Sequence, residues 1–176
     1  DDGIHADGAL TITGGSFSIP YCYEGIEGST ITINGGTFDI TANDDGLNAG
    51  DGTSNAPGMA NENCWIVING GEFTIVSDGD SIDSNGDLTI NGGTLDLTCN
   101  GNGNTAIDTD GTYTNNGGDV TTNDGSENGS GEMGGFGGQG NAAAGGPGGQ
   151  MGQPGGGGQM PDSAPGQNDQ NGTAST

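Results

Sequence analysis

Carboxylate side chains recur at matching positions along the first part of this sequence, and their types and spacing suit the binding of metal cations. One column of acids precedes a short apolar motif, at Asp2, Glu24, Asp45 and Asp80. A second column follows the apolar residue of that motif, at His5, Glu27, Asn48, Asp83 and Asp108. Oxygen ligands from carboxylates and amides suit Ca²⁺, which accepts about six to eight of them in flexible geometry. We therefore expect Ca²⁺ between successive repeats, held by the seven acids and Asn48.

The charge balance of the chain supports this expectation. The 176 residues include 24 Asp and Glu and no Lys or Arg, which gives a formal net charge of -24. Two carboxylates stacked one repeat apart repel each other by roughly 3 kcal/mol at an effective dielectric constant of about 20. Either their pKa values rise or a cation lies between them. The alternative is a solvated acidic edge that binds no metal.

The same charge balance excludes several kinds of partner. A nucleic acid needs cationic side chains against its phosphates, and this chain has none. Anionic membrane surfaces are excluded for the same reason. No apolar run approaches the length of about 18 residues that spans a bilayer, so we expect no membrane insertion.

A few other side chains could contribute to binding. Trp65, Tyr21 and Tyr23 are candidates for stacking on sugar rings. For Trp65, packing against a neighbouring insertion is an equally good interpretation. His5 shares a column with the expected ligands, but we interpret this lone histidine as a turn residue.

Internal repeats indicate how these side chains are positioned. Gly-Gly pairs fall at residues 14–15, 35–36, 70–71, 92–93 and 117–118. The steps between them are 21, 35, 22 and 25 residues, so the period is about 22 with one long step. The long step contains 35 − 22 = 13 extra residues, at about 51–63, which include Pro57 and read as a loop. Such a period is typical of a solenoid.

Each repeat contains three short stretches with strand character. The first is centred on one apolar residue, at Ile4, Ile26, Leu47, Ile82 or Ile107. The second and third alternate apolar and polar residues, as in residues 31–33 and 38–40, on either side of the Gly-Gly pair. The sequence therefore predicts an all-β parallel β-helix of about five rungs of about 22 residues, with three short strands per rung. Ladders of Ile, Leu and Phe would form its narrow core.

The repeats divide the chain into two parts. We assign residues 1–125 to the β-helix, including the insertion loop at 51–63, and residues 126–176 to a low-complexity tail rich in Gly, Gln and Pro. The tail has too little apolar surface to offset the entropy of ordering its backbone, so we expect it to be mobile in the monomer. The sequence begins at Asp1 inside a repeat, and we expect a mature product or a fragment.

The three cysteines, Cys22, Cys64 and Cys99, allow two interpretations. One pair could form a disulfide and leave one free thiol. Alternatively, all three are small buried apolar residues.

The repeated motifs resemble a bacterial family of calcium-binding, carbohydrate-binding parallel β-helix proteins described as binding cellulose and polygalacturonate. The resemblance is carried by residues 1–7 (DDGIHAD), 23–29 (YEGIEGS), 44–49 (DDGLNA), 80–86 (DSIDSNG) and 106–111 (AIDTDG). It implies a right-handed β-helix similar to polysaccharide lyases. It also implies calcium sites between the rungs at the matching positions, Asp2, Glu24, Glu27, Asp45, Asn48, Asp80, Asp83 and Asp108.

We therefore expect a secreted bacterial protein, extracellular or at the cell surface, that binds acidic or cellulosic polysaccharide without cleaving it. A lyase of this fold usually uses Lys or Arg as the base, and the chain has neither. The alternative is a structural subunit of a calcium-stabilised filament or surface layer. Its β-helices would stack head to tail into a homopolymer, since the end of a solenoid exposes unpaired strand edges.

Overall fold

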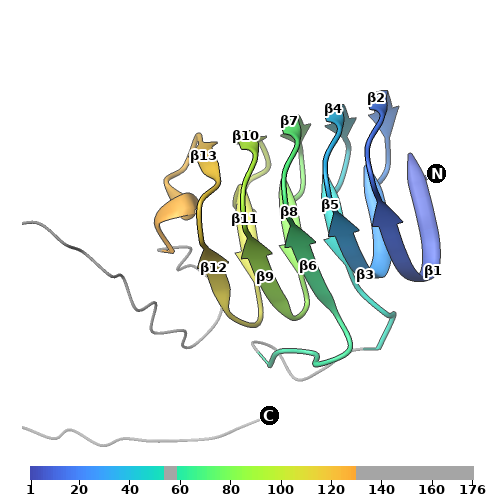
Figure 1. Ribbon diagram of the computed structural model, residues 1–176, viewed down its shortest axis with the longest axis vertical. Helices are drawn as coiled ribbons and strands as arrows, with labels where there is room; N and C mark the ends of the chain where they lie inside the picture. The colour runs from blue at the N-terminus through green and yellow to red at the C-terminus, as the bar shows by residue number, and fades with distance from the viewer. Residues whose placement is uncertain (54–58, 130–176) are drawn as a thin grey trace, which may run out of the picture. The chain divides into compact units, whose positions relative to one another are not determined.

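The computed structural model describes residues 1–53 and 59–129. Apart from residues 126–129, the expected tail lies outside the described residues, and so does its predicted mobility. Within the described residues the chain is a stack of parallel strands that runs from β1 to β13 (Figure 1). The predicted all-β solenoid of about five rungs is confirmed.

The strands group into five successive rungs. The first two rungs contain β1 (Ile4–Ile12) with β2 (Ser16–Cys22), and β3 (Ile26–Ile33) with β4 (Thr37–Ala42). The third contains β5 (Leu47–Ala49), β6 (Trp65–Ile68) and β7 (Glu72–Ser77). The fourth contains β8 (Ile82–Ser84), β9 (Asp87–Ile90) and β10 (Thr94–Cys99). The fifth contains β11 (Ile107–Thr109), β12 (Tyr113–Asn115) and β13 (Asp119–Thr122), and the 3₁₀ helix η1 (Ser126–Asn128) follows.

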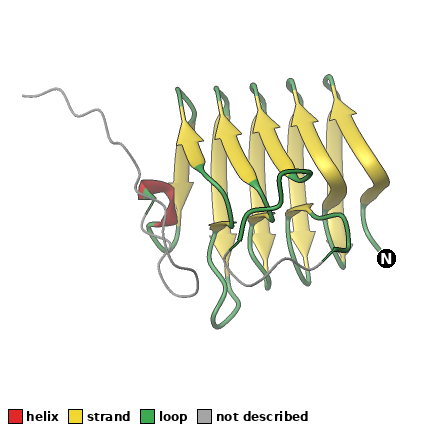
Figure 2. Ribbon diagram, turned by 90° about the horizontal axis from the view of Figure 1, so that it is seen from below, coloured by secondary structure: helices red, strands yellow, loops and turns green. Residues whose placement is uncertain are grey.

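Two parallel sheets form the walls of the stack. The third strands pair in the order β13-β10-β7-β4-β2, and the first and second strands together form the other sheet (Figure 2). The expectation of three separate strands holds for rungs three to five. In rungs one and two the first and second segments are continuous in β1 and β3, and the β1–β3 register shifts between Ala6 and Ala9.

Apolar ladders fill the space between the sheets. Ile26, Leu47 and Ile82 are in register and have no exposed surface. The phenyl rings of Phe17, Phe38 and Phe73 are stacked, with centroid distances of 4.9 and 4.6 Å. Because each rung lies on equivalent residues of the next, few apolar residues suffice for a continuous core.

The corner between the second and third strands depends on glycine. The second glycine of four Gly-Gly pairs has a positive φ, for example 125° at Gly36. A Cβ atom at Gly36 would lie 3.1 Å from the carbonyl oxygen of Gly15 in the rung below, so a larger residue would crowd the stack. Asparagines beside the corner form hydrogen bonds from rung to rung. The Nδ2 atoms of Asn69, Asn91 and Asn116 each donate at 2.8 Å to the Oδ1 atom of the asparagine one rung before, starting from Asn34.

Residues 50–64 connect β5 to β6, where the sequence predicts an insertion loop. The buried Asn61 anchors the described part of this connection, since its amide donates to Asp51 Oδ1 at 3.0 Å and its backbone N–H donates to Asn85.

Cys22, Cys64 and Cys99 are all buried free thiols, which agrees with the interpretation as small apolar residues. Among the residues that the structure describes, no helix has the length and apolar character to cross a membrane.

Candidate functional site

The second acidic column lies on the first strand of each rung. In these strands the apolar residue points inward, so the residue after it faces outward. Strand pairing aligns Glu27 with Asn48, Asn48 with Asp83, and Asp83 with Asp108. His5 pairs with Glu27 at the start of the column. The predicted register of this column is therefore confirmed.

Backbone hydrogen bonds align the first column. The N–H groups of Gly3, Gly25 and Gly46 donate to the carbonyl oxygens of Glu24, Asp45 and Asp80 at 2.8–2.9 Å. Glycine is needed for this close stacking, because a Cβ atom at Gly25 would lie 2.2 Å from the carbonyl oxygen of Gly46. The two columns lie side by side, separated only by the short turn into the first strand.

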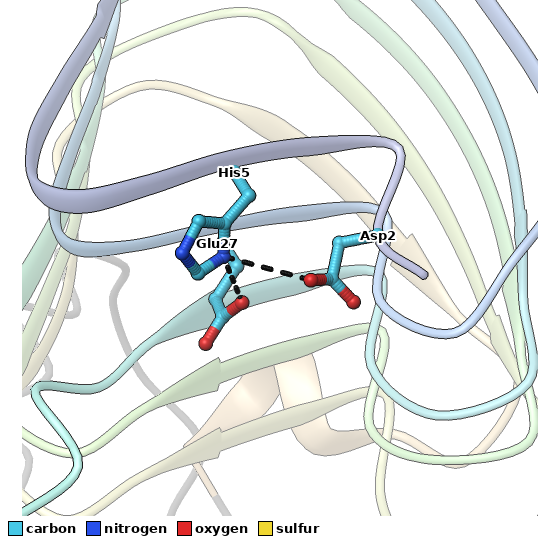
Figure 3. Close-up of side chains that lie close together, drawn as sticks. All are labelled: Asp2, His5 and Glu27. Atoms are coloured by element: carbon cyan, nitrogen blue, oxygen red, sulfur yellow. Dashed lines mark hydrogen bonds and ion pairs between the residues drawn. The ribbon is translucent and has the colours of Figure 1, made fainter.

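The first cluster lies between rungs one and two and contains Asp2, His5 and Glu27. One ligand-type atom from each of these residues lies within 4.8 Å of the others (Figure 3). The Nδ1 atom of His5 contacts Glu27 Oε2 and lies 3.5 Å from Asp2 Oδ2. On the other side of the ring, Nε2 contacts Asp7 Oδ1 at 3.1 Å. Hydrogen bonds with Asp7 and Glu27 raise the pKa of His5 above its ordinary value. The interpretation of His5 as a turn residue is wrong, because His5 lies within β1.

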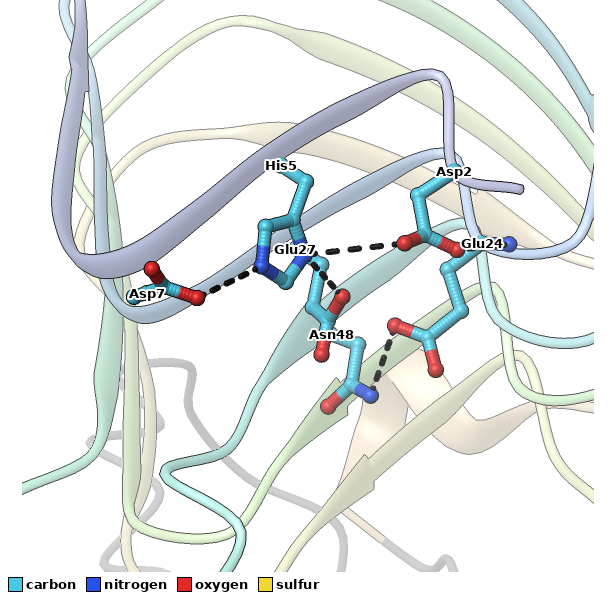
Figure 4. A network of polar contacts seen from close by, with 6 residues as sticks. All are labelled: Asp2, His5, Asp7, Glu24, Glu27 and Asn48. Atoms are coloured by element: carbon cyan, nitrogen blue, oxygen red, sulfur yellow. Dashed lines mark hydrogen bonds and ion pairs between the residues drawn. The ribbon is translucent and has the colours of Figure 1, made fainter.

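Asn48 divides the column at the middle of the stack. Its Nδ2 atom donates to Glu24 Oε2 at 2.9 Å (Figure 4). Burial raises the pKa of Glu24, and the hydrogen bond from Asn48 opposes this effect. The amide therefore places a neutral donor where another carboxylate would add repulsion.

The second cluster lies between rungs four and five and contains only carboxylates, from Asp80, Asp83 and Asp108. Ligand-type oxygens from the three residues lie within 4.8 Å of one another. Asp45, in the rung before, accepts a hydrogen bond from the backbone N–H of Asp80 at 2.7 Å. This arrangement stacks acids on three consecutive rungs.

Burial and mutual repulsion disturb the ionisation of this cluster. Burial, followed by the charges of Asp45, Asp80, Asp108 and Asp110, raises the pKa of Asp83 to about 8. Burial is also the main cause that raises the pKa of Asp45 to about 7 and that of Asp80 to about 6. The carboxylates therefore gain protons near neutral pH unless a cation compensates their charge.

The structure places five of the eight predicted ligands in these two clusters. Glu24 and Asn48 form a hydrogen-bonded pair between the clusters, and Asp45 lies one rung before the second cluster. Asp7 was missed by the reasoning from sequence, and Asp110 was considered only as a ligand at a junction between two copies. Each lies two residues beyond a member of the second column, His5 or Asp108. Alternation with period two could have indicated both, since residues two apart on a strand share a face.

A separate hollow of about 240 Å³ lies beside the insertion. Trp65, at the start of β6, lines it and pairs with Thr30 and Asp87 of the adjacent rungs. Polar groups from Asn61, Glu62 and Asp87 also line the hollow. The indole is partly exposed. The hollow thus combines an aromatic surface with hydrogen-bonding groups.

The two candidate tyrosines do not line this hollow. Tyr21 is at the end of β2 in the other sheet and is 77% exposed. Tyr23 follows in the turn before the acidic column, and its hydrogen bond with Asp44 raises the pKa of its hydroxyl. The three aromatic candidates therefore do not form one sugar-binding surface.

Comparison with known proteins gives one match. Neither the curated proteins nor the solved structures contain a sequence or fold that matches the chain. The model of the family of carbohydrate-binding domain-containing proteins matches residues 1–138, and the chain belongs to this family.

Proposed function

We propose that the chain is a non-catalytic module that binds polysaccharide through the hollow at Trp65. Membership of the carbohydrate-binding family supports the binding of carbohydrate. We choose this site because a partly exposed indole lies there among carboxylate and amide groups. A sugar ring has apolar faces that stack on an aromatic side chain and hydroxyl groups around its edge that need polar partners.

The described anchor of the insertion makes this hollow a prepared surface. Asn61 is 5% exposed, and its side chain and backbone bond to Asp51, Asn63, Cys64 and Asn85. A site whose walls are already ordered loses less conformational entropy on binding than a mobile one. The same contacts fix Trp65 next to the anchored segment.

The charges beside the indole favour a neutral glycan over a bare polyanion. Glu62 and Asp87 both line the hollow, and they would repel the carboxylates of pectate. We therefore propose a cellulosic glycan as the direct ligand, with acidic glycans bound through bridging Ca²⁺. Binding of polygalacturonate would then require calcium, whereas binding of cellulose at the hollow would not.

We further propose Ca²⁺ as a structural ion of the β-helix. The oxygen-only cluster of Asp80, Asp83 and Asp108 is the best supported position, and Asp45 lies one rung away. Asp2, Glu24, Glu27 and Asn48 belong to the same two columns nearer the N-terminal rung. An acidic surface with calcium-dependent stability suits a secreted protein at the bacterial cell surface, which is our proposal for its location.

The absence of Lys and Arg supports binding without cleavage. A lyase needs a base beside the uronate, and an enzyme acting on a polyanion needs cations to hold it. We propose no catalytic residues.

Replacing Trp65 with Ala tests the sugar site. We expect at least a tenfold loss of binding to insoluble cellulose in a depletion assay, because stacking of the sugar ring on the indole is lost. Tyr21→Ala is the matched control, since Tyr21 is an exposed aromatic residue outside the hollow. Equal binding by the wild-type chain and both variants would contradict the assignment of the site.

A filament of β-helices stacked head to tail is the alternative function. At the fifth rung, the backbone N–H groups of Ala106 and Ile107 donate to Asp124 and Ser126 at 2.7 and 3.0 Å, and not to a further strand. The first strand of the fifth rung therefore has no free N–H groups at these two residues to pair with another copy, which opposes end-to-end association there.

A further inference from the structure

We propose that Asp2, His5 and Glu27 form a binding site for a transition-metal dication such as Zn²⁺, distinct in metal preference from the oxygen-only cluster of rungs four and five. The first cluster is the one place in the described residues where an imidazole nitrogen enters the ligand column, because the chain has a single histidine. Imidazole suits zinc, copper and nickel, whereas Ca²⁺ is bound through oxygen.

The separation of His5 and Asp2 suits one bound ion, and the Glu27 carboxylate would reach it after moving away from Nδ1, with which it is now in contact. In a tetrahedral site with metal–ligand distances of about 2.0–2.2 Å, neighbouring ligand atoms lie roughly 3.4 Å apart. His5 Nδ1 and Asp2 Oδ2 are 3.5 Å apart. Glu27 Oε2 faces the same nitrogen from the next rung (Figure 3). Zn²⁺ would replace the Nδ1 proton that now links His5 to Glu27, so the ring and two carboxylates would supply three ligands and leave room for water.

The opposite side of the ring carries an independent feature of metal-binding histidines. His5 Nε2 lies 3.1 Å from Asp7 Oδ1, outside the cluster of ligand atoms (Figure 4). A histidine that ligates a metal usually donates its other N–H to a carboxylate or carbonyl group, which fixes the tautomer and the orientation of the ring. Asp7 would therefore act as a positioning residue that keeps the proton on Nε2 and leaves Nδ1 for the metal.

The site is accessible from solvent and is prepared by the fold. The His5 side chain is 45% exposed, and those of Asp2 and Glu27 are 24% and 26% exposed. Parallel pairing of β1 with β3 places His5 directly beside Glu27. In the third rung Asn48 occupies the same column, so the backbone at this position accommodates an amide side chain in place of imidazole.

The single histidine makes a direct test practical. The full chain, purified without a histidine tag and labelled with ¹⁵N-histidine, would give one pair of imidazole nitrogen resonances. One equivalent of Zn²⁺ should shift Nδ1 strongly and leave Nε2 protonated, whereas the same concentration of Ca²⁺ should not. A matching effect of Ca²⁺, a shift at Nε2 alone, or no shift would each overturn the proposal.

Variants separate this site from the other cluster and from the thiols. His5→Asn, which copies the residue of the third rung, should lower Zn²⁺ affinity at least tenfold in calorimetry while calcium binding elsewhere is kept. Asp7→Asn should lower it by up to about 10-fold, the lower end of the range for such outer partners, because the Asp7 side chain is fully exposed, and it should weaken the preference of the proton for Nε2. Asp83→Asn should leave the Zn²⁺ response of His5 unchanged. Equal zinc affinity in wild type and His5→Asn would assign the metal to other groups and refute the site.

Discussion

Asp83 shows how the acidic columns destabilise the folded protein when no metal is bound. Its carboxyl group lies between Asn48 and Asp108 and is surrounded by acids of the same and adjacent rungs. Its pKa is raised to about 8, well above that of an Asp in an unfolded chain. The folded state therefore holds this proton more tightly than the unfolded state, and ionisation of the group opposes folding.

These raised pKa values make the metal-free fold less stable as the pH rises. Between about pH 4 and pH 8 the folded chain binds more protons than the unfolded chain, so the free energy of unfolding falls as pH rises. Asp45 and Asp80, with pKa values raised to about 7 and about 6, add to the same trend. The raised pKa of His5 acts in the same direction, since its favourable contacts are lost when it deprotonates.

We predict that the melting temperature of the protein in chelator falls between pH 5 and pH 8.5. Calcium should remove most of this fall, because it binds the ionised carboxylates of the folded state. At a hundredfold excess over its dissociation constant, calcium would stabilise the fold by about 2.7 kcal/mol. Scanning calorimetry at both pH values, with and without calcium, measures the effect. A melting temperature independent of both pH and calcium would contradict it.

Asp83→Asn separates repulsion from metal binding. In chelator at pH 8 the variant should be more stable than the wild type, by on the order of 1–3 kcal/mol, because a partly buried charge among other acids is removed. In calcium it should gain less stability than the wild type does. Asp96→Asn, on the exposed face of β10 in the same rung, is the matched control and should change neither quantity.

At the scale of the strands, sequence periodicity was sufficient to predict the fold wherever one residue type recurs in every rung. Ile26, Leu47 and Ile82 form the predicted ladder because a slip of one residue would turn them outward. The continuity of β1 and β3 was not predictable, since it depends on the angle at which the chain turns and not on residue type. The contacts of His5 were missed because a repeat pattern gives a residue's column but not the partners on both sides of its ring.

The contacts that end the stack at the fifth rung also could not be predicted from the repeat. Asp124 and Ser126 follow the last strand, outside any repeating position, yet they accept hydrogen bonds from Ala106 and Ile107 of the fifth rung. Burial alone would raise the pKa of Asp124, but hydrogen bonds from Ser126 and Ala106 hold it below its ordinary value. These two side chains replace the carbonyl groups that a sixth rung would provide.

Asp124→Ala should therefore destabilise the β-helix. The backbone N–H of the fully buried Ala106 would lose its acceptor, which costs about 1–3 kcal/mol. The exposed Asp119 of the same rung provides the control variant, Asp119→Ala, which removes a charge but no acceptor for the first strand. Urea unfolding curves compare the two. Equal midpoints would show that Asp124 does not stabilise the fifth rung.

At the scale of the whole molecule, the net charge of -24 opposes association between copies unless cations intervene. Calcium would weaken this repulsion, which is the condition under which a head-to-tail filament could form. The outer edge of the fifth rung then decides whether growth occurs. Its first strand is closed by Asp124 and Ser126, whereas η1 forms no equivalent bonds with the backbone of β12 in the described residues.

We predict that the wild-type chain sediments as a monomer at micromolar concentration in millimolar calcium. A second copy could pair with the fifth rung only after the segment around Asp124 had moved away, at the cost of the bonds to Ala106 and Ile107. The double variant Asp124→Ala, Ser126→Ala removes that closure, so it should associate more than the wild type in calcium and should return to monomer in chelator. Asp119→Ala controls for the loss of charge alone. Analytical ultracentrifugation measures the three proteins side by side, and electron microscopy identifies the particles. Filaments of the wild-type chain in calcium would instead support the structural subunit as the function, because growth would then proceed despite the closed edge.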